Sequence, residues 1–181
     1  MIVTKKLFSI EDEELQLHNY RVGKMSSRFA KFVGLHEQMI EDIAICGSLH
    51  DIGKAVIPKR ILNKPTTLTN EEFKQIKMHS IYSYMILREM GYNEKICLIS
   101  KYHHENYNGT GYPDKLKEKE IPLGARVLRI VDMFDALTND RIYRKAMNKK
   151  SALFLMVKEN HLFDPDLFSM FKDFIDIAMV I

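Results

Sequence analysis

The stretch Glu37–Asp51, EQMIEDIAICGSLHD, places an apolar helix pattern directly before a histidine and an aspartate. Its apolar residues recur at intervals of three or four positions, as one face of an α-helix requires. Gly53 follows two residues after Asp51, and glycine is the residue that most often ends a helix. The sequence therefore predicts that His50 and Asp51 lie near the C-terminal end of a buried helix.

Helical patterns continue on both sides of this stretch, and almost no segment alternates as a strand would. A Thr-x-x-Glu capping box at Thr69 and Glu72 marks one helix start, and Asp164-Pro165 marks another. Further helices are predicted over Ile10–Phe32, 69–91, 93–104, 123–140, 148–160 and from 165 onward. The predicted fold is all-α, a single compact bundle of about six or seven helices.

Composition limits the class of protein. The chain has 181 residues, of which 46% are apolar and 28% charged, so one domain over residues 1–181 is expected, with a core over about 12–175 and no separate regulatory domain. A net charge of +3 is too small to indicate a nucleic-acid polymer as partner. Cys46 and Cys97 stand apart without CxxC spacing, which favours free thiols in a cytoplasmic protein. No signal peptide or membrane span is expected.

Histidines gather at helix positions. A lone helical histidine is most often an ordinary buried or surface residue, but several at helix ends can converge inside a bundle. Imidazole and carboxylate together suit divalent iron, manganese or zinc. The candidates for such a site are His18, His50, Asp51, His79, His103, His104 and Asp132. His36 and His161 lie beside turn signals without carboxylate partners, and both are expected at the surface.

Two motifs carry a family resemblance. LHDIGK at residues 49–54 and HHENYNGTGYP at residues 103–113 resemble the signatures of the HD-GYP family, phosphodiesterases of the HD hydrolase superfamily that act on cyclic di-GMP. The resemblance extends over nearly the whole chain, from His18 to the region near Asp166. It implies an HD-domain-like bundle with two or three divalent metal ions, usually iron or manganese.

The resemblance also implies roles for individual residues. The family's metal ligands fall on Glu14, His18, His50, Asp51, His79, His103, His104 and Asp132. His50 and Asp51 would carry the catalytic centre, and Lys54 would contact the substrate phosphate. The remaining substrate contacts would come from Gly111, Tyr112, Pro113, Arg141 and Arg144.

Glu14 bears on the number of ions. It precedes His18 by four residues, so both side chains lie on one helix face and can reach a single ion, which favours three metals. The alternative is that Glu14 belongs to an acidic first turn, where carboxylates suit the positive end of the helix dipole.

Two loop positions depart from the family pattern. The family often has an arginine after HHE, where this chain has Asn106, and an aspartate before its first loop glycine, where this chain has Asn108. Neither is a ligand, but each removes a charge near the substrate and puts the rate and the choice of dinucleotide in question.

Two classes of function stay open at this stage. The first is a phosphodiesterase that opens cyclic di-GMP to pGpG, with or without further cleavage to GMP. It would use hydroxide generated at the metal ions, because coordination lowers the pKa of water. A hydrolase of a related cyclic dinucleotide or nucleotide is a variant of it. The second is a metal-containing binding or adaptor module that engages a diguanylate cyclase or another signalling protein. It would do so through the loop that follows His104 and ends in Gly111-Tyr112-Pro113, called the GYP loop below. A homodimer is compatible with both.

Overall fold

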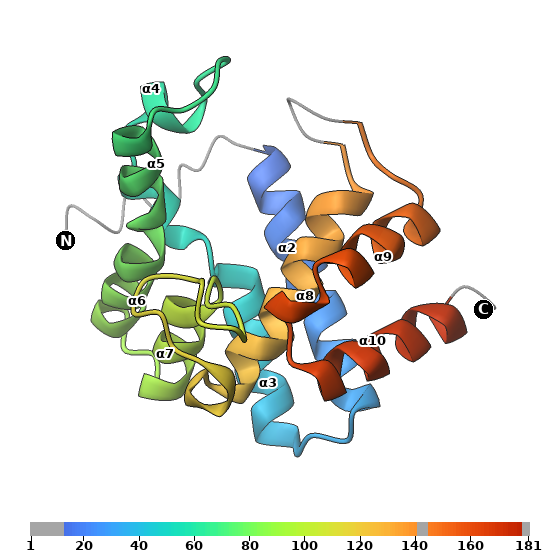
Figure 1. Ribbon diagram of the computed structural model, residues 1–181. Coiled ribbons are helices and arrows are strands. Elements are labelled where there is room, and N and C mark those ends of the chain that lie inside the picture. Colours follow the sequence, from blue (N-terminus) through green and yellow to red (C-terminus); the bar gives the residue numbers. More distant parts are fainter. Residues whose placement is uncertain (1–12, 141–144, 179–181) are drawn as a thin grey trace.

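The computed structural model describes residues 13–140 and 145–178, and within these ranges it contains helices and no strand. Arg141 and Arg144 lie outside the described residues. The α-helices are α2 (Glu13–Phe32), α3 (Glu37–Leu49), α4 (Lys59–Leu62), α5 (Asn70–Lys77), α6 (His79–Glu89), α7 (Glu94–Tyr102), α8 (Leu123–Thr138), α9 (Lys149–Lys158) and α10 (Pro165–Ala178) (Figure 1). Three short 3₁₀ segments complete the structure: η1 (Ile52–Val56), η2 (Glu118–Glu120) and η3 (Asn160–Leu162). The all-α prediction is confirmed.

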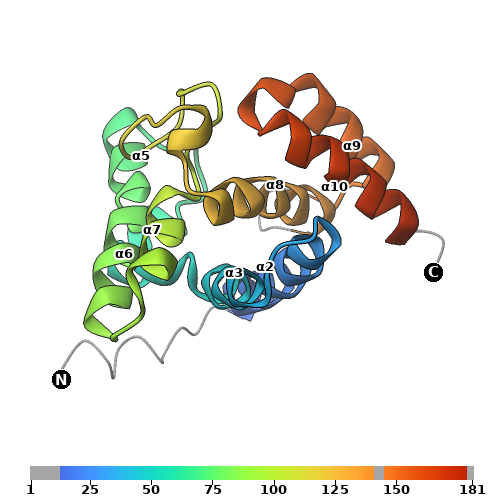
Figure 2. The same cartoon turned by 90° about the horizontal axis from the view of Figure 1, so that it is seen from below.

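Helix α8 lies at the centre of the bundle. It contacts α2, α3, α7, α9 and α10, and Figure 2 shows it crossing the middle of the molecule, with α5 to α7 on one side and α9 and α10 on the other. Its sequence explains this position, because apolar residues occur on most of its faces, including Ala125, Ile130 and Val131, which are all buried. Two aspartates, Asp132 and Asp135, are buried on the same helix.

Helix ends follow the predicted signals where these are local. The Thr69 hydroxyl accepts a hydrogen bond from the Glu72 amide, and the Glu72 carboxylate accepts one from the Thr69 amide, so the capping box is present. The Asp164 carboxylate accepts hydrogen bonds from the amides at the start of α10. Gly34 lies in the turn after α2 and has a φ of +77°, a conformation that favours glycine.

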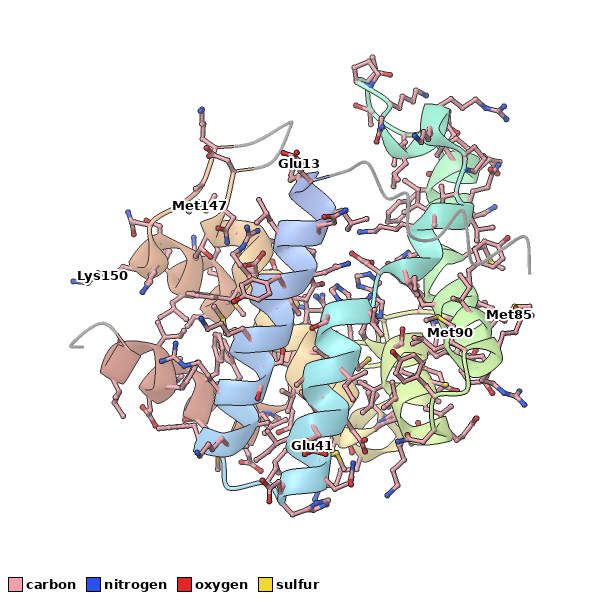
Figure 3. The ribbon with its side chains drawn as sticks, turned by 180° about the vertical axis from the view of Figure 1, so that it is seen from behind. Glu13, Glu41, Met85, Met90, Met147 and Lys150 are labelled. Carbon is pink, nitrogen blue, oxygen red and sulfur yellow. The ribbon has the colours of Figure 1, made fainter. Side chains whose placement is uncertain are left out.

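The helix predicted over 69–91 is two helices in the structure. Helix α5 ends and α6 begins around Met78, whose backbone remains in the right-handed helical region. The apolar period of the sequence continues across this junction and therefore does not reveal it. The junction places His79 in the first turn of α6, buried and facing the bundle. Met85 on the same helix and Met90 at its C-terminal cap (Figure 3) are exposed, with 53% and 38% of their surface accessible.

Segment η1 packs tightly against α6. The Gly53 amide donates a hydrogen bond of 2.9 Å to the Ser83 hydroxyl, and a Cβ atom at Gly53 would collide with the backbone carbonyl of His79. Only glycine allows this approach. The close contact brings Asp51, which directly precedes η1, next to the start of α6. Among the described residues, no helix combines the length and the apolar character needed to cross a membrane.

Candidate metal centre

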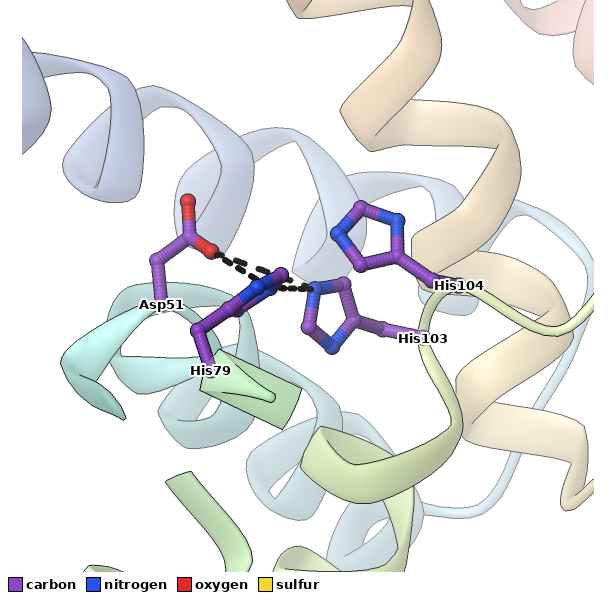
Figure 4. A group of neighbouring side chains, drawn as sticks. All are labelled: Asp51, His79, His103 and His104. Carbon is purple, nitrogen blue, oxygen red and sulfur yellow. Dashed lines mark hydrogen bonds and ion pairs between the residues drawn. The ribbon is translucent and has the colours of Figure 1, made fainter. Parts of the chain in front are cut away.

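The predicted histidine and aspartate ligands come together where the ends of three helices meet α2 and α8. His50 and His103 cap the C-terminal ends of α3 and α7, and His79 begins α6. His18 lies on α2, and Asp132 lies on α8. Two groups have ligand atoms within 4.8 Å of one another: Asp51, His79, His103 and His104 (Figure 4), and His18, His50 and Asp51.

Asp51 belongs to both groups, one oxygen to each. Its Oδ1 atom lies 3.2 Å from Nε2 of His79 and 3.9 Å from Nε2 of His103. Its Oδ2 atom lies 3.4 Å from Nε2 of His50 and 3.8 Å from Nε2 of His18. A carboxylate placed in this way can bridge two cations.

Asp132 joins the second group, and Glu14 joins neither. Oδ1 of Asp132 lies 3.2 Å from Nε2 of His18 and 3.9 Å from Nε2 of His50. Glu14 is exposed near the start of α2 and is absent from both groups. His36 and His161 are exposed, as expected.

Backbone carbonyls orient three of the imidazoles in the same way. Nδ1 of His50 lies 2.8 Å from the Gly47 carbonyl oxygen. The corresponding distances are 2.7 Å from His79 to Ile76 and 2.6 Å from His103 to Ser100. Because a carbonyl only accepts hydrogen bonds, each Nδ1 carries the proton and donates it. Each Nε2 is then left with a lone pair that faces Asp51.

His18 is oriented by a carboxylate that sequence reasoning did not identify. Its Nδ1 lies 2.7 Å from Oδ2 of Asp135, and the Arg21 guanidinium donates to both oxygens of Asp135, at 2.7 and 3.0 Å. Asp135 follows Asp132 by three positions, so both carboxylates lie on one face of α8. That spacing is the signal that would have found it.

The local electrostatics keep most of the imidazoles neutral. Burial lowers the pKa of His50, His79 and His104, and it lowers that of His103 to about 3. Burial acts in the same direction on His18, but hydrogen bonds with Asp132 and Asp135 outweigh it and raise the pKa to about 9.

The central carboxylates are ionised. Burial alone would raise the pKa of Asp51, but the charge of Lys54 holds it well below its usual value. Burial would likewise raise the pKa of Asp132, but its hydrogen bond with His18 holds it well below its usual value. Two anionic carboxylates among imidazoles that are neutral apart from His18 form an arrangement that attracts cations.

The facing atoms of the centre fit a divalent metal. Nε2 of His79 lies 3.4 Å from Nε2 of His103, and with both Nδ1 atoms protonated this contact joins two acceptors. Nε2 of His50 and Oδ1 of Asp51 are buried and have no hydrogen-bond partner among the described residues. Leaving buried acceptors unpaired costs about 1–3 kcal/mol each, which a cation bound between them would offset. Nitrogen and carboxylate donors together suit iron, manganese or zinc.

The predicted substrate residues within the described ranges lie beside the centre. Nζ of Lys54 lies 2.6 Å from Oδ2 of Asp51. The Tyr112 ring packs on His104, with centroids 4.8 Å apart and an angle of 33° between the planes. A Cβ atom at Gly111 would collide with the backbone of Glu105 and Asn106, so the loop folds closely on itself at that residue.

A buried carboxylate, that of Glu105, binds the backbone where this loop ends. Glu105 is 1% exposed, and its Oε1 accepts hydrogen bonds from the amides of Asp114 and Lys115. Pro113 follows Tyr112 through a cis peptide bond. The loop is therefore fixed against the end of α7, directly after the two adjacent histidines.

Comparison with known proteins agrees with this geometry. A cyclic di-GMP phosphodiesterase of Thermotoga maritima is 39% identical over 146 residues, which cover 78% of this chain and 39% of that protein. A 3'3'-cGAMP-specific phosphodiesterase of Vibrio cholerae is 34% identical over 142 residues, which cover 78% of this chain and 33% of that protein. The chain thus spans well under half the length of these relatives.

The fold is also that of a solved structure. An HDGYP protein from Bdellovibrio bacteriovorus superposes with a TM-score of 0.72 at 21% identity, over 90% of this chain and 52% of that one. The family model described as HD domain matches residues 3–167, which include every residue of the metal centre. The chain therefore belongs to the HD domain family.

Proposed function

We propose that the protein is a metal-dependent phosphodiesterase of the HD-GYP type that hydrolyses cyclic di-GMP to pGpG. The observation that carries this proposal is the convergence of three acceptors, Oδ1 of Asp51 and the Nε2 atoms of His79 and His103, without a donor between them. The names of the relatives in Thermotoga and Vibrio support a cyclic dinucleotide as substrate.

Bound divalent ions would lower the pKa of water toward neutrality and withdraw charge from the phosphoryl oxygens. Residues of the chain would hold these ions and bind the phosphate. Asp51 would hold two ions with its two oxygens, and the imidazoles of His50, His79 and His103 are already turned toward them by backbone hydrogen bonds. Lys54 provides a cation beside Asp51 for a phosphate oxygen.

We propose iron or manganese as the metal, because the resemblance to the HD-GYP family implies these two and a donor set of imidazoles and carboxylates fits both. Glu14 decides between two and three ions. It lies one helical turn before His18 on α2, and a third ion would draw this exposed carboxylate toward the centre. Metal content measured on anaerobically prepared wild type and Glu14→Ala tests this. Three ions falling to two support Glu14 as a ligand, and two ions in both proteins exclude it.

The substrate is tested directly. Purified protein is loaded with Mn²⁺ or Fe²⁺ and incubated separately with cyclic di-GMP, 3'3'-cGAMP and linear pGpG, and the products are separated by chromatography. Formation of pGpG from cyclic di-GMP is the expected result, and release of GMP from pGpG would show a second step. Faster turnover of 3'3'-cGAMP would reassign the substrate. Binding without any hydrolysis would favour the adaptor function.

Cellular context is a separate proposal. Cys46 and Cys97 are both free and buried, which supports the cytoplasm as the place where the protein acts. A diguanylate cyclase or other signalling partner, and a homodimer, stay predictions. The single domain over residues 1–181 and the substrate roles of Arg141 and Arg144 also stay predictions.

A further inference from the structure

Arg129 lies on α8 one helical turn before Asp132, on the face that carries this carboxylate toward the metal centre. Its Nε donates a hydrogen bond of 2.9 Å to Oδ1 of Asn106 in the GYP loop. The Asn106 amide in turn donates to the Thr110 hydroxyl at 3.0 Å, and that hydroxyl donates to Asn108 at 2.7 Å. The loop therefore holds the guanidinium by one edge.

Arg129 forms no ion pair in the part of the chain that the structure describes. Arg21 pairs with Asp135 and Arg126 pairs with Asp164, whereas the guanidinium of Arg129 lies over the Phe163 ring, 5.8 Å from its centroid, and its Nη atoms have no hydrogen-bond partner among the described residues. The side chain is half-buried, and burial lowers its pKa, although arginine keeps its charge in proteins. A partly desolvated cation with two free terminal nitrogens is suited to an incoming anion.

The surroundings indicate where that anion would sit. Arg129 shares a face of α8 with Asp132 of the metal centre, and its hydrogen bond to Asn106 fixes the guanidinium at the GYP loop. Asn106 occupies the position at which the HD-GYP pattern often has an arginine. In this chain the guanidinium of Arg129, which comes from α8, bonds to the side chain of Asn106 instead.

We propose that Arg129 binds a phosphate of the cyclic dinucleotide substrate through its Nη atoms, with Asn106 holding the guanidinium in position. This inference rests on the proposed function. Arginine suits the role better than lysine, because its planar fork can donate two parallel hydrogen bonds to phosphate oxygens. The competing role is that Arg129 only anchors the loop through Asn106.

Three variants separate the two roles. Arg129→Gln removes the charge, Arg129→Lys keeps the charge without the fork, and Asn106→Ala removes the anchor but keeps the guanidinium. Arg88→Gln, at an exposed arginine on α6, is the matched control. For each metal-loaded protein, calorimetry gives the dissociation constant of pGpG, kinetics give KM and kcat for cyclic di-GMP, and elemental analysis gives metal content.

Arg129→Gln is expected to weaken pGpG binding roughly 10- to 100-fold, the range of a lost charge-assisted contact, and to raise KM with unchanged metal content. Arg129→Lys should fall between it and wild type, Asn106→Ala should lose only a few-fold, and Arg88→Gln should match wild type. Equal losses in Asn106→Ala and Arg129→Gln would show a loop anchor and overturn the proposal, as would unchanged binding in Arg129→Gln.

Folding and function are controlled separately. If Arg129→Gln does not fold, Arg129→Lys decides, and wild-type affinity in that variant overturns the fork contact. A wild-type protein that neither binds pGpG nor hydrolyses any cyclic dinucleotide contradicts the proposed function itself. That outcome is distinct from active wild type with an indifferent Arg129.

Discussion

Nζ of Lys54 lies 2.6 Å from Oδ2 of Asp51, the oxygen that also faces His50 and His18. The ammonium therefore occupies the same carboxylate oxygen that a metal ion would use. If the proposed function holds, metal and lysine would compete for Asp51, and a lysine released from Asp51 would become available to a substrate phosphate.

Replacing Lys54 with methionine should have opposite effects on metal and substrate. Removing a cation beside the centre should leave Mn²⁺ binding equal to or tighter than in wild type, whereas the KM for cyclic di-GMP should rise about 10-fold, since one charged contact is lost. Metal titration and steady-state kinetics measure the two effects. Weaker Mn²⁺ binding together with an unchanged KM would show that Lys54 serves only to orient Asp51.

Asp51→Ala should abolish turnover and deplete bound metal. Asp51 supplies one oxygen to each ligand group, so its loss affects both groups at once. Circular dichroism should show largely unchanged helicity, because α3 ends before Asp51. Asp173→Ala, at an exposed position on α10, is the matched control. Near-normal hydrolysis by Asp51→Ala would rule out the assigned centre.

Asp135→Asn should weaken metal binding about 10-fold or more, because the carboxylate that orients His18 loses its charge. Arg21→Gln should act in the same direction with a smaller effect, since it leaves Asp135 ionised. Competition titration with a chelating dye measures both affinities. The exposed Asp173 again provides the control, as Asp173→Asn, and equal affinities in all variants would exclude this positioning role.

Gly111→Ala should destabilise the protein by about 1–3 kcal/mol, the usual range for overpacking, and should raise KM by displacing Tyr112. The added Cβ would meet backbone atoms, which cannot move aside as a flexible side chain does. Thermal unfolding and kinetics measure the two effects. Gly34→Asn is the control: its φ is +77°, but no atom lies within 4 Å of an added Cβ, and asparagine tolerates this conformation. A Gly111→Ala protein as stable as wild type would contradict the tight loop.

Cys46 and Cys97 should resist iodoacetamide between pH 7 and pH 9. An ordinary thiol, with a pKa of about 8.5, reacts faster as pH rises through this range. Burial raises the pKa of both thiols, that of Cys46 to well above its usual value, so the thiolate stays scarce and unreachable in the folded state. Mass spectrometry of native and urea-unfolded protein measures the labelling. Rapid native labelling at pH 8 would show that the core opens readily.

The sequence predicted what depends on neighbours along the chain. Caps at Thr69 and Asp164 formed as expected, since each needs only residues two or three positions away. The break near Met78 was missed, because the apolar period continues through it. The histidines were found through helix-end placement and the family resemblance.

The supporting contacts of the site depend on distant pairing. Asp135 acts on His18 from 117 positions away, and Arg129 meets Asn106 across 23 positions. Hydrophobic period cannot reveal such partners, because it reports which face of a helix is buried and not what that face meets. For Asp135 the three-residue spacing from Asp132 is a usable signal. For Arg129 the usable signal is that position 106 carries an asparagine where the family pattern often has an arginine.

The pairing of His18 with Asp135 also sets an order of events during synthesis. Helices α2 and α3 form a neighbouring pair that can assemble as soon as both have left the ribosome. The contacts of His18 and His50 with Asp132, and of His18 with Asp135, can form only after α8 has been translated. A nascent chain that ends before α8 already contains Asp51, His79, His103 and His104, but it lacks Asp132 and the carboxylate that orients His18. The ligand group around His18 is therefore the last part of the centre to be completed.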